Sequence, residues 1–257
     1  MLADPAREAI LAFCAEDPIE RVFLEDVARR GFARFRAVEG EQGLAALCYF
    51  GANVVPSGKG CGVFAGEAAV RGARMIIGEE GAVSDLWAEA RSVMPEPRED
   101  RPGQPVYAIE VAPEGDSSGL RTARVQDLDF LLPACAATHR EELGVDPLER
   151  DPDGFRRRTL SQIQEGRSWL WEEDGTILFK AEASAWTPSA VQLQQVWVDP
   201  AVRRQGYGAR GLRDLCRLLL EHVPVVCLFV RSENGAAIRL YEAIGMEHVL
   251  DYRSVLL

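Results

Sequence analysis

The alternation of apolar and polar positions is most regular in the second half of the chain. Three runs rich in apolar and β-branched residues, at 168–173, 176–186 and 191–198, are separated by the turn-forming segments "DG" and "TPS". Strands joined by such short turns pair with their neighbours, so these runs predict an antiparallel meander. Around it the pattern predicts strands at 120–125, 223–230 and 248–257, and helices at 127–139, 151–166, 212–219 and 236–244.

The first half of the chain has a weaker pattern. Two helical patterns open it, and the second runs from Val22 to Arg30. Strand-like runs follow at 32–39 and 44–50. A helix is expected from Val83 to Val93, with Ser84 as its N-cap. These elements predict a small α/β region without chemistry of its own.

Proline and glycine are concentrated at 94–119. Within this segment 106–111 alternates like a strand, so the polar "PEGDSSG" after it is the expected linker. We place a domain boundary near residue 117, which gives an N-terminal domain of residues 1–116 and a C-terminal domain of residues 117–257. The length of 257 residues allows two modest domains or one large one.

Composition and charge narrow the classes of function. The chain is 47% hydrophobic and 27% charged, which suits a globular protein with a core. Its 40 acidic and 29 basic residues give a net charge of -11. This surplus disfavours a dedicated binder of nucleic acid or of an anionic membrane, because both need clustered Lys and Arg. A polyanionic ligand must therefore meet a local basic site.

Cysteine, histidine and the first residues of the chain bear on metals and location. The six cysteines form no C-x-x-C pair and lie mostly in apolar runs, so we expect reduced core cysteines. The three histidines are isolated and show no zinc-ligand spacing, so no metal is expected. No apolar run is long enough to cross a bilayer, and "MLADPAREAILAFCAEDP" has no signal pattern, so we expect a cytoplasmic protein.

The segment "RRQGYGARG", which begins at Arg203, fits two phosphate-binding patterns. Gly206, Gly208 and Gly211 match the G-x-G-x-x-G dinucleotide fingerprint, whereas Arg203 and the first two glycines match R-x-x-G-x-G. A dinucleotide fingerprint needs its first glycine almost at the end of a strand. Here seven residues separate Val198 from Gly206, and only one β-α-β unit is available. The context therefore favours R-x-x-G-x-G.

Such a loop can bind a pyrophosphate for simple physical reasons. Backbone N–H groups from Gln205 to Ala209 can converge on the anion, and glycines let the backbone approach closely. The N-terminus of the following helix adds partial positive charge, and Arg203 or Arg204 supplies a cation. Three more arginines of that helix either add basicity or line a solvated face: Arg210, Arg213 and Arg217.

This order of elements resembles the acetyl-CoA site of the GNAT N-acetyltransferase superfamily. Further on, "VRSENGAAIRLYEAIGM" resembles the family's next motif, an Asn followed by a helix ending in L-Y-x-x-x-G. The resemblance implies that Asn234 contacts the CoA arm and that the hydroxyl of Tyr241 protonates the departing thiolate. Considered alone, Asn234 would be a helix N-cap and Tyr241 an amphipathic core residue.

From about Gly43 onward the chain looks like a bacterial two-part family that joins an N-terminal domain of unknown function to a GNAT domain. "CYFGANVVP" and "LPACAATHREELGVDP" are among the segments that carry this resemblance. It implies an α/β (α+β) fold, in which a C-terminal GNAT domain has a mixed, mostly antiparallel sheet with flanking helices. The smaller N-terminal α/β domain could be a degenerate GNAT-like copy. Its "SGKGCGVFAG" lacks P-loop spacing, so we assign it no cofactor.

The reaction that the resemblance implies is direct transfer of an acetyl group from acetyl-CoA to a primary amine of a small molecule or protein. Positioning of the two substrates would supply much of the catalysis. Backbone groups of Val196 and Val198 would hold the pantetheine, in a strand splayed from its parallel neighbour. The expected CoA-binding residues are therefore Val196, Val198, Arg203, Arg204, Gln205, Gly206, Gly208, Ala209 and Asn234.

A general base must deprotonate the acceptor ammonium, because only the neutral amine attacks. Glu182 is the candidate, since partial burial in the meander would raise its pKa. It could instead be a solvent-side strand residue paired with Lys180. Glu141 and Glu142 border the acceptor side in this fold and could recognise a cationic substrate. The catalytic residues expected from the sequence are thus Tyr241 and Glu182.

Two other functions remain open. The chain could be a catalytically silent acyl-CoA-binding or regulatory module, with the N-terminal half as an interaction domain. It could also be an aminoacyl transferase that uses charged tRNA, although the net charge and the lack of a basic arm count against this. The expected partners are acetyl-CoA and an amine acceptor, without nucleic acid or membrane, and a homodimer stays open.

Overall fold

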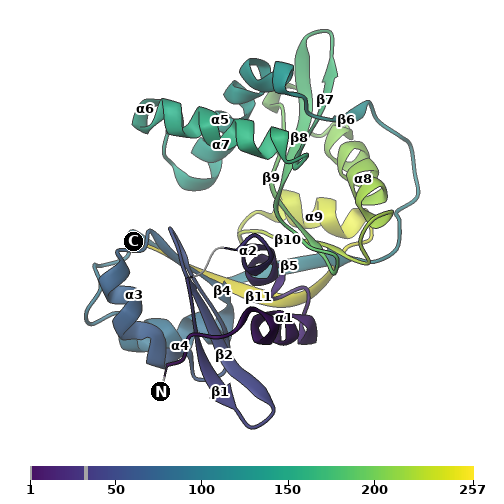
Figure 1. The fold of residues 1–257 in the computed structure, drawn as a ribbon. Helices are drawn as coiled ribbons and strands as arrows, with labels where there is room; N and C mark the ends of the chain where they lie inside the picture. The colour runs from purple at the N-terminus through teal and green to yellow at the C-terminus, as the bar shows by residue number, and fades with distance from the viewer. Residues whose placement is uncertain (1, 32–33) are drawn as a thin grey trace.

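The computed structural model describes residues 2–31 and 34–257. Figure 1 shows the N-terminal half below and the C-terminal half above, with β5 and β11 between them. The helices and strands of the described residues are α1 (Arg7–Glu16), α2 (Val22–Arg29), β1 (Phe35–Gly40), β2 (Gly43–Phe50), β3 (Val54–Gly58), α3 (Ala65–Arg71), β4 (Met75–Glu79), α4 (Glu80–Ala90), β5 (Glu99–Ile109), β6 (Leu120–Thr122), α5 (Leu128–Leu143), α6 (Pro147–Arg150), α7 (Pro152–Gln164), β7 (Ser168–Glu173), β8 (Thr176–Trp186), β9 (Val191–Val198), α8 (Tyr207–Leu220), β10 (Val226–Phe229), α9 (Gly235–Ala243) and β11 (Glu247–Leu256).

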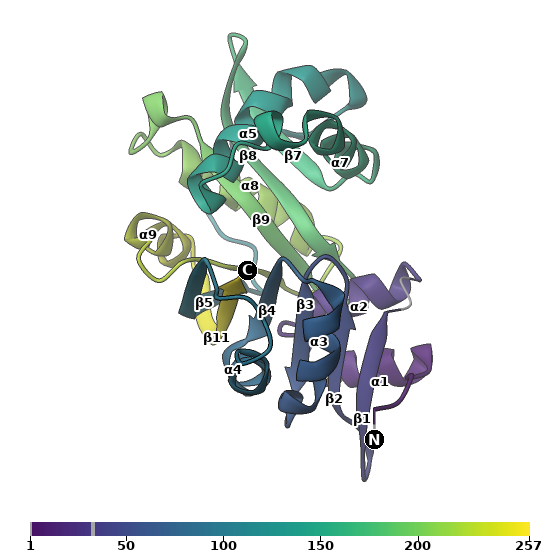
Figure 2. The same ribbon diagram turned by 90° about the vertical axis from the view of Figure 1, so that its left-hand side faces the viewer.

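All the described strands join one sheet in the order β1-β2-β3-β4-β11-β5-β10-β9-β8-β7-β6. Only β3–β4 and β9–β10 pair in parallel among the described strands; the others are antiparallel. Helices cover both faces: in the C-terminal half α5 and α7 lie on one face of β7–β9 and α8 on the other (Figure 2). The expected mixed, mostly antiparallel α/β fold is confirmed.

The two halves repeat one order of elements. Two helices, three antiparallel strands, a helix, a strand, a helix and a strand occur as α1-α2-β1-β2-β3-α3-β4-α4-β5 and, apart from the additional short elements β6 and α6, again as α5-α7-β7-β8-β9-α8-β10-α9-β11. In both copies the helix after the third strand connects two parallel strands. This repeat supports the expectation that the N-terminal half is a degenerate copy of the C-terminal fold.

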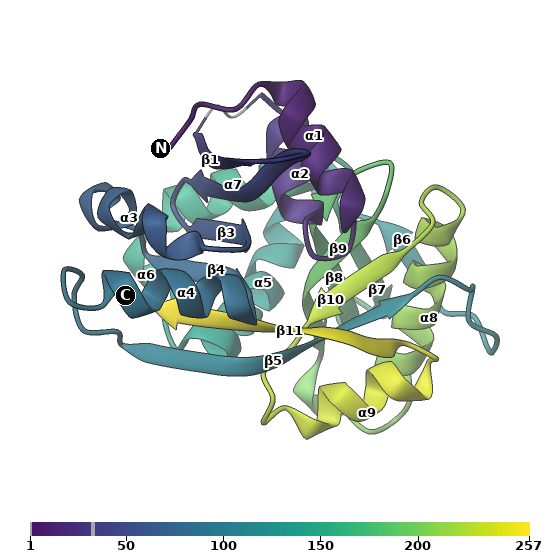
Figure 3. The same ribbon diagram turned by 90° about the horizontal axis from the view of Figure 1, so that it is seen from below.

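The last strand of each copy lies inside the other copy. β5 pairs with β10 and β11 of the C-terminal half, while β11 pairs with β4 of the N-terminal half. The two long strands run side by side through the middle of the molecule (Figure 3). The expected boundary near residue 117 falls between β5 and β6 and stays a prediction, because the strands of the two halves are interleaved.

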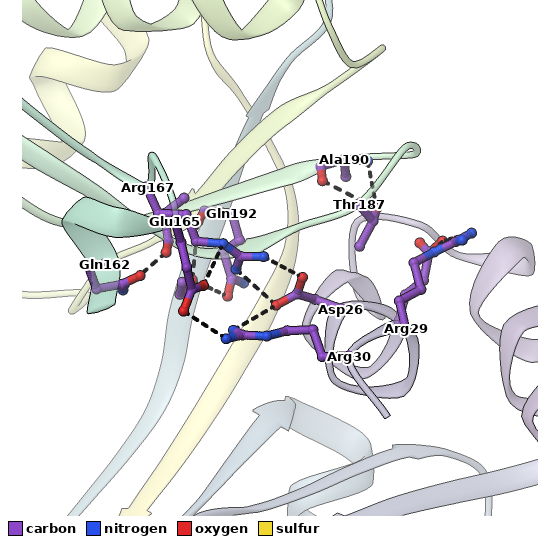
Figure 4. Close-up of polar contacts among 12 residues, drawn as sticks. Asp26, Arg29, Arg30, Gln162, Glu165, Arg167, Thr187, Ala190 and Gln192 are labelled. Atoms are coloured by element: carbon purple, nitrogen blue, oxygen red, sulfur yellow. Dashed lines mark hydrogen bonds and ion pairs between the residues drawn. The ribbon is translucent and has the colours of Figure 1, made fainter. Parts of the chain in front are cut away.

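A buried ion pair links the halves beside the shared sheet. Arg167, which precedes β7, donates two hydrogen bonds of 2.9 and 2.7 Å to the carboxylate of Asp26 on α2 (Figure 4). Arg30 and Glu165 extend this contact at 2.9 Å. The Asp26 and Arg167 side chains are only 4% and 11% exposed. The carboxylate therefore satisfies a charge that burial would otherwise leave unpaired.

Some of the elements and caps predicted from local sequence patterns agree with the structure and others do not. β7, β8 and β9 confirm the limits of the meander, and all six cysteines are free and buried. The expectation for Ser84 is wrong: α4 begins at Glu80, and the carboxylate of Glu79 caps it by accepting from the N–H groups of Gly81 and Ala82. The predicted strand at 32–39 begins at Phe35, and its first two positions lie outside the described residues.

Candidate active site

In the C-terminal half, the parallel strands β9 and β10 are paired over a short stretch only. β9 pairs with β10 only at Val191 and Gln192, while β9 itself continues to Val198. Gln195 has a φ of +50° at a shift of register between β9 and β8, which marks a bulge. The bulge lies in the part of β9 that has no pairing with β10.

Backbone groups at the end of β9 face the side of β10. The N–H of Asp199 donates to Leu178 of β8 at 3.1 Å. Successive N–H groups of a strand point to opposite sides, so those of Val196 and Val198 face away from β8. These two residues thus present main-chain N–H groups beyond the end of the β9–β10 pairing, while the carbonyl of Val198 accepts from Arg203 at 3.1 Å.

The loop after β9 leads into α8 with its amides free. Gly206 is the N-cap of α8 with a φ of +88°, and the first helical hydrogen bond runs from Arg210 to Gly206 at 3.1 Å. Among the described residues, the N–H groups from Gln205 to Ala209 have no hydrogen-bond acceptor. Free N–H groups at a helix N-terminus form an anion-binding site. The segment therefore fits a pyrophosphate.

The glycines of this segment have different roles. A Cβ at Gly208 would lie 3.2 Å from Val198 and 3.3 Å from Leu240, so glycine lets α8 approach β9 and α9. A Cβ at Gly211 would lie 2.6 Å from the ring of Phe179 on β8. Gly211 is thus needed for packing α8 against the sheet. The third glycine of the apparent dinucleotide fingerprint is therefore explained by this close packing.

The arginines around the loop are mostly engaged. The guanidinium of Arg203 donates to the carbonyl of Val198 at 3.1 Å and to both carboxylate oxygens of Glu141 at 2.8 and 2.9 Å. Arg204, with a φ of +65°, is exposed. On α8, Arg210 stacks on Trp171, and Arg217 donates to the carbonyls of residues 113 and 115 in the linker. Arg204 is thus the better placed of the two candidate cations.

Asn234 and Tyr241 lie at the start and near the end of α9. The side-chain oxygen of Asn234 accepts from the N–H of Ala237 at 3.2 Å, so Asn234 is an N-cap. Tyr241 is buried, with its ring 5.9 Å from that of Tyr107. Burial, with a smaller effect of the Glu142 carboxylate, raises the pKa of Tyr241. Its hydroxyl group is therefore protonated at neutral pH, as a proton donor must be.

Glu182 lies in a buried polar cluster. Its carboxylate accepts from Lys180 at 2.8 Å, and Lys180 also contacts the thiol of Cys135 at 3.2 Å and the amide oxygen of Gln195 at 3.0 Å. Burial acts to lower the pKa of Lys180, but Glu182 and Cys135 raise it overall. Lys180 is therefore a cation, and its ammonium group pairs with the Glu182 carboxylate inside the protein. The pairing with Lys180 occurs in the interior and not on a solvent face.

Two comparisons with family models bear on this geometry. Residues 136–246 match the model described as Acetyltransferase (GNAT) family, and residues 33–131 match the domain of unknown function DUF4081. The chain joins a DUF4081 domain to a GNAT domain. The matched GNAT region contains the end of β9, the loop, α8 and α9.

Relatives of known name match parts of the GNAT region. Mycothiol acetyltransferase of Nocardioides sp. is 32% identical over 108 residues, which are 39% of this chain and 35% of the relative. N-alpha-acetyltransferase RimI of Mycobacterium tuberculosis is 39% identical over 62 residues, 24% of this chain and 38% of the relative. The chain thus spans little more than a third of the length of these curated relatives.

The fold of the whole chain also occurs in solved structures. A GNAT-family protein from Novosphingobium aromaticivorans superimposes with a TM-score of 0.60 at 17% identity, covering 93% of this chain and 97% of that one. At this identity the likeness concerns the fold alone. In residues 2–31 and 34–257, no helix is long and apolar enough to span a membrane, and no group of three or more His, Cys, Asp or Glu side chains could hold a metal ion.

The loop between β3 and α3 of the DUF4081 half has different surroundings from the loop between β9 and α8. At the corresponding position between β3 and α3 lie Gly60 and Gly62, in a shallow hollow that Asp85 and Glu89 of α4 also line. A Cβ at Gly62 would lie 3.0 Å from Glu89. Two carboxylates beside this loop would repel a phosphate. The assignment of no cofactor to "SGKGCGVFAG" stays a prediction.

Several residues around the GNAT site give no signal in the sequence. Gln195 is a β residue with positive φ, which ordinary strand patterns do not show. Arg101 of β5 and Arg231 after β10 both donate to the main-chain carbonyl of Glu142. These contacts join segments far apart in the sequence, so only the fold reveals them.

Proposed function

We propose that the GNAT domain transfers an acetyl group from acetyl-CoA directly to a primary amine. The observation that carries this proposal is the row of free N–H groups from Gln205 to Ala209, at the N-terminus of α8 and beside the diverging end of β9. It supports pyrophosphate binding in the loop and pantetheine binding at Val196 and Val198. The thioester would then lie near the diverging strands.

The proposed chemistry needs one proton acceptor and one proton donor. The amine attacks the thioester carbonyl, the C–N bond forms, the C–S bond breaks, and Tyr241 protonates the thiolate. Its raised pKa supports this role, because the hydroxyl keeps its proton until it is needed. Glu182 is the expected base, and in the structure its carboxylate is paired with Lys180 at 2.8 Å.

The acceptor is proposed as a class only. One relative is named as an N-alpha-acetyltransferase, which supports an amine as acceptor. The net charge of -11 favours a cationic acceptor by electrostatic steering. An ammonium on a small molecule or on a protein meets both conditions.

Two measurements test the proposal. Acetyl-CoA at about 100 times its Kd should stabilise the protein by about 2.7 kcal/mol, measured as a rise in Tm. Thiol release from acetyl-CoA with a panel of primary amines should reveal turnover. A rise in Tm without turnover on any amine would indicate a silent acyl-CoA-binding module, and the absence of both would reject the proposal.

A charge-matched pair of variants locates the donor site. Arg203→Ala with Arg204→Ala should weaken acetyl-CoA binding, because the loop loses both cations that flank the free amides. The control is Arg157→Ala with Arg158→Ala on the exposed face of α7, which changes the net charge equally. Equal affinity in the two double variants would show that pyrophosphate binds elsewhere.

A further inference from the structure

Gln195 has an unusual backbone conformation in the part of β9 that does not pair with β10. Between Lys180 and Glu182 β8 has one residue, whereas the opposite part of β9 has two, Gln195 and Val196. This two-to-one pairing is a β-bulge. The φ of +50° at Gln195 is unfavourable for a residue with a side chain, so the surrounding structure must stabilise it.

The ammonium group of Lys180 holds the Gln195 side chain. It donates to the amide oxygen of Gln195 at 3.0 Å, to the carboxylate of Glu182 at 2.8 Å and to the thiol sulfur of Cys135 on α5 at 3.2 Å. The Lys180 side chain is 0% exposed, so these three acceptors take the place of water. A hydrogen bond from a charged donor contributes about as much stability as a left-handed φ costs. The contact with Lys180 can therefore keep Gln195 in its bulged conformation.

Stability alone does not explain a cation at position 180. Apolar side chains of similar volume often replace a buried ion pair without loss of stability. One of the three acceptors of Lys180, the Gln195 amide, belongs to the strand that is proposed to bind pantetheine. The lysine therefore connects the interior of the meander with the donor site.

The bulge lies directly before the residues proposed to bind pantetheine. Val196 and Val198 follow Gln195 in β9, and the pairing of β9 with β10 extends no further than Gln192. A bulge bends its strand, so the conformation of Gln195 affects where the next N–H groups lie. Hydrogen bonds to pantetheine need these N–H groups at a suitable distance and angle. A change at the bulge should thus weaken binding of the pantetheine part of CoA more than binding of its nucleotide part.

We propose that Lys180 is a positioning residue for the acyl donor and that it acts through Gln195, by holding the bulge of β9. Its ammonium group is enclosed by protein groups, so it acts on the donor through the main chain of β9. The inference rests on the proposed function and adds to it a buried cation that lies outside the loop and α8.

The first test compares two ligands of the full-length protein by isothermal titration calorimetry. They are acetyl-CoA and 3′-phospho-ADP, the nucleotide part of CoA, which carries the pyrophosphate without pantetheine. Gln195→Leu removes one acceptor of Lys180 and leaves its ion pair with Glu182 in place. It should weaken acetyl-CoA binding by about 3- to 10-fold, the effect of one lost neutral hydrogen bond, with little change for 3′-phospho-ADP. Equal losses for both ligands, or no loss for acetyl-CoA, would overturn the inference.

Lys180 is tested together with its carboxylate partner. Lys180→Met combined with Glu182→Gln removes both members of the ion pair, so no charge stays buried and unpaired. This double variant should show the same selective loss of acetyl-CoA affinity as Gln195→Leu. The matched control is Arg156→Met with Asp129→Asn, which removes an exposed ion pair between α7 and α5 and should bind both ligands as the unaltered protein does. Binding of acetyl-CoA by the Lys180 variant as tight as in the control would contradict the proposed role.

Glycine separates the φ of residue 195 from its contact with Lys180. Gln195→Gly loses the same amide as Gln195→Leu, but glycine adopts a positive φ without steric cost. It should therefore bind acetyl-CoA more tightly than Gln195→Leu does. In this background the combined Lys180→Met and Glu182→Gln changes should weaken binding less than they do in the unaltered protein, because the side chain that Lys180 holds is already gone.

Two results of this cycle would refute the positioning role and leave the proposed function standing. One is weaker acetyl-CoA binding by Gln195→Gly than by Gln195→Leu, and the other is an equal effect of the Lys180 and Glu182 changes in both backgrounds. Failure of the unaltered protein to bind either ligand would instead overturn the proposed function, and the inference with it.

Discussion

The ion pair between Asp26 and Arg167 should contribute strongly to the stability of the whole chain. Its two hydrogen bonds of 2.9 and 2.7 Å lie in the interior between the halves. Removing one member of a buried pair typically costs about 3–5 kcal/mol, because the other charge stays buried. Glu165 remains 3.4 Å from Arg167, so we expect Asp26→Leu to lie near the lower figure.

Arg167→Met should cost more than Asp26→Leu. It leaves Asp26 with Arg30, whose guanidinium is 3.8 Å away and whose side chain is 39% exposed. A loss of about 3–5 kcal/mol corresponds to a fall in Tm of roughly 6–20 °C for a chain of this size. The double variant should be less destabilised than the sum of the two single variants, because no charge then remains unpaired.

The measurement is thermal and urea unfolding of the four proteins in a double-mutant cycle. Arg156→Met, which breaks an exposed pair with Asp129, is the control and should change stability by less than about 1 kcal/mol. We expect one cooperative transition throughout, since both halves share the sheet. Additive single effects, or effects no larger than the control, would refute the reasoning.

Three further predictions concern the GNAT site. Glu141→Gln should tighten acetyl-CoA binding by no more than about fivefold in a titration, because it releases Arg203 from a half-exposed ion pair that is worth at most about 1 kcal/mol. Weaker binding would contradict this. Gly211→Ala should lower the free energy of unfolding by about 1–3 kcal/mol, since its methyl group overlaps the ring below it, whereas Gly66→Ala in α3, with open space around it, should not. Because burial raises the pKa of Tyr241, ionisation of this hydroxyl should cause no loss of activity below about pH 10, and Tyr241→Phe should lower kcat at every pH tested; a fall in rate near pH 8 that Tyr241→Phe abolishes would count against a protonated tyrosine.

Local patterns in the sequence predict the helices and strands, but they do not predict which distant strands pair with one another. The meander is found at its expected limits because apolar alternation and the "DG" turn are both local signals. β5 begins at Glu99, well before the predicted strand at 106–111. The prediction missed its first part because Pro102 and Gly103 are typical of loops. Its place between β10 and β11 depends on strands more than a hundred residues away, and no local pattern encodes it.

The same distinction applies to the site. The loop and the tyrosine follow from motif order, whereas the engagement of Arg203 by Glu141 depends on where α5 ends in space. The position of Glu182 in the meander predicts a candidate base with a partly buried side chain. Its sequestration by Lys180 inside the fold follows from the packing of α5 over β8.

The exchange of β5 and β11 makes each half of the chain depend on a strand from the other half. A chain shortened to its C-terminal half would lack β5, which lies between β10 and β11 in the sheet. The facing edges of β10 and β11 would then have unpaired main-chain N–H and C=O groups. A shortened first copy would have the same defect between β4 and β5. The DUF4081 half and the GNAT half therefore each complete the sheet of the other.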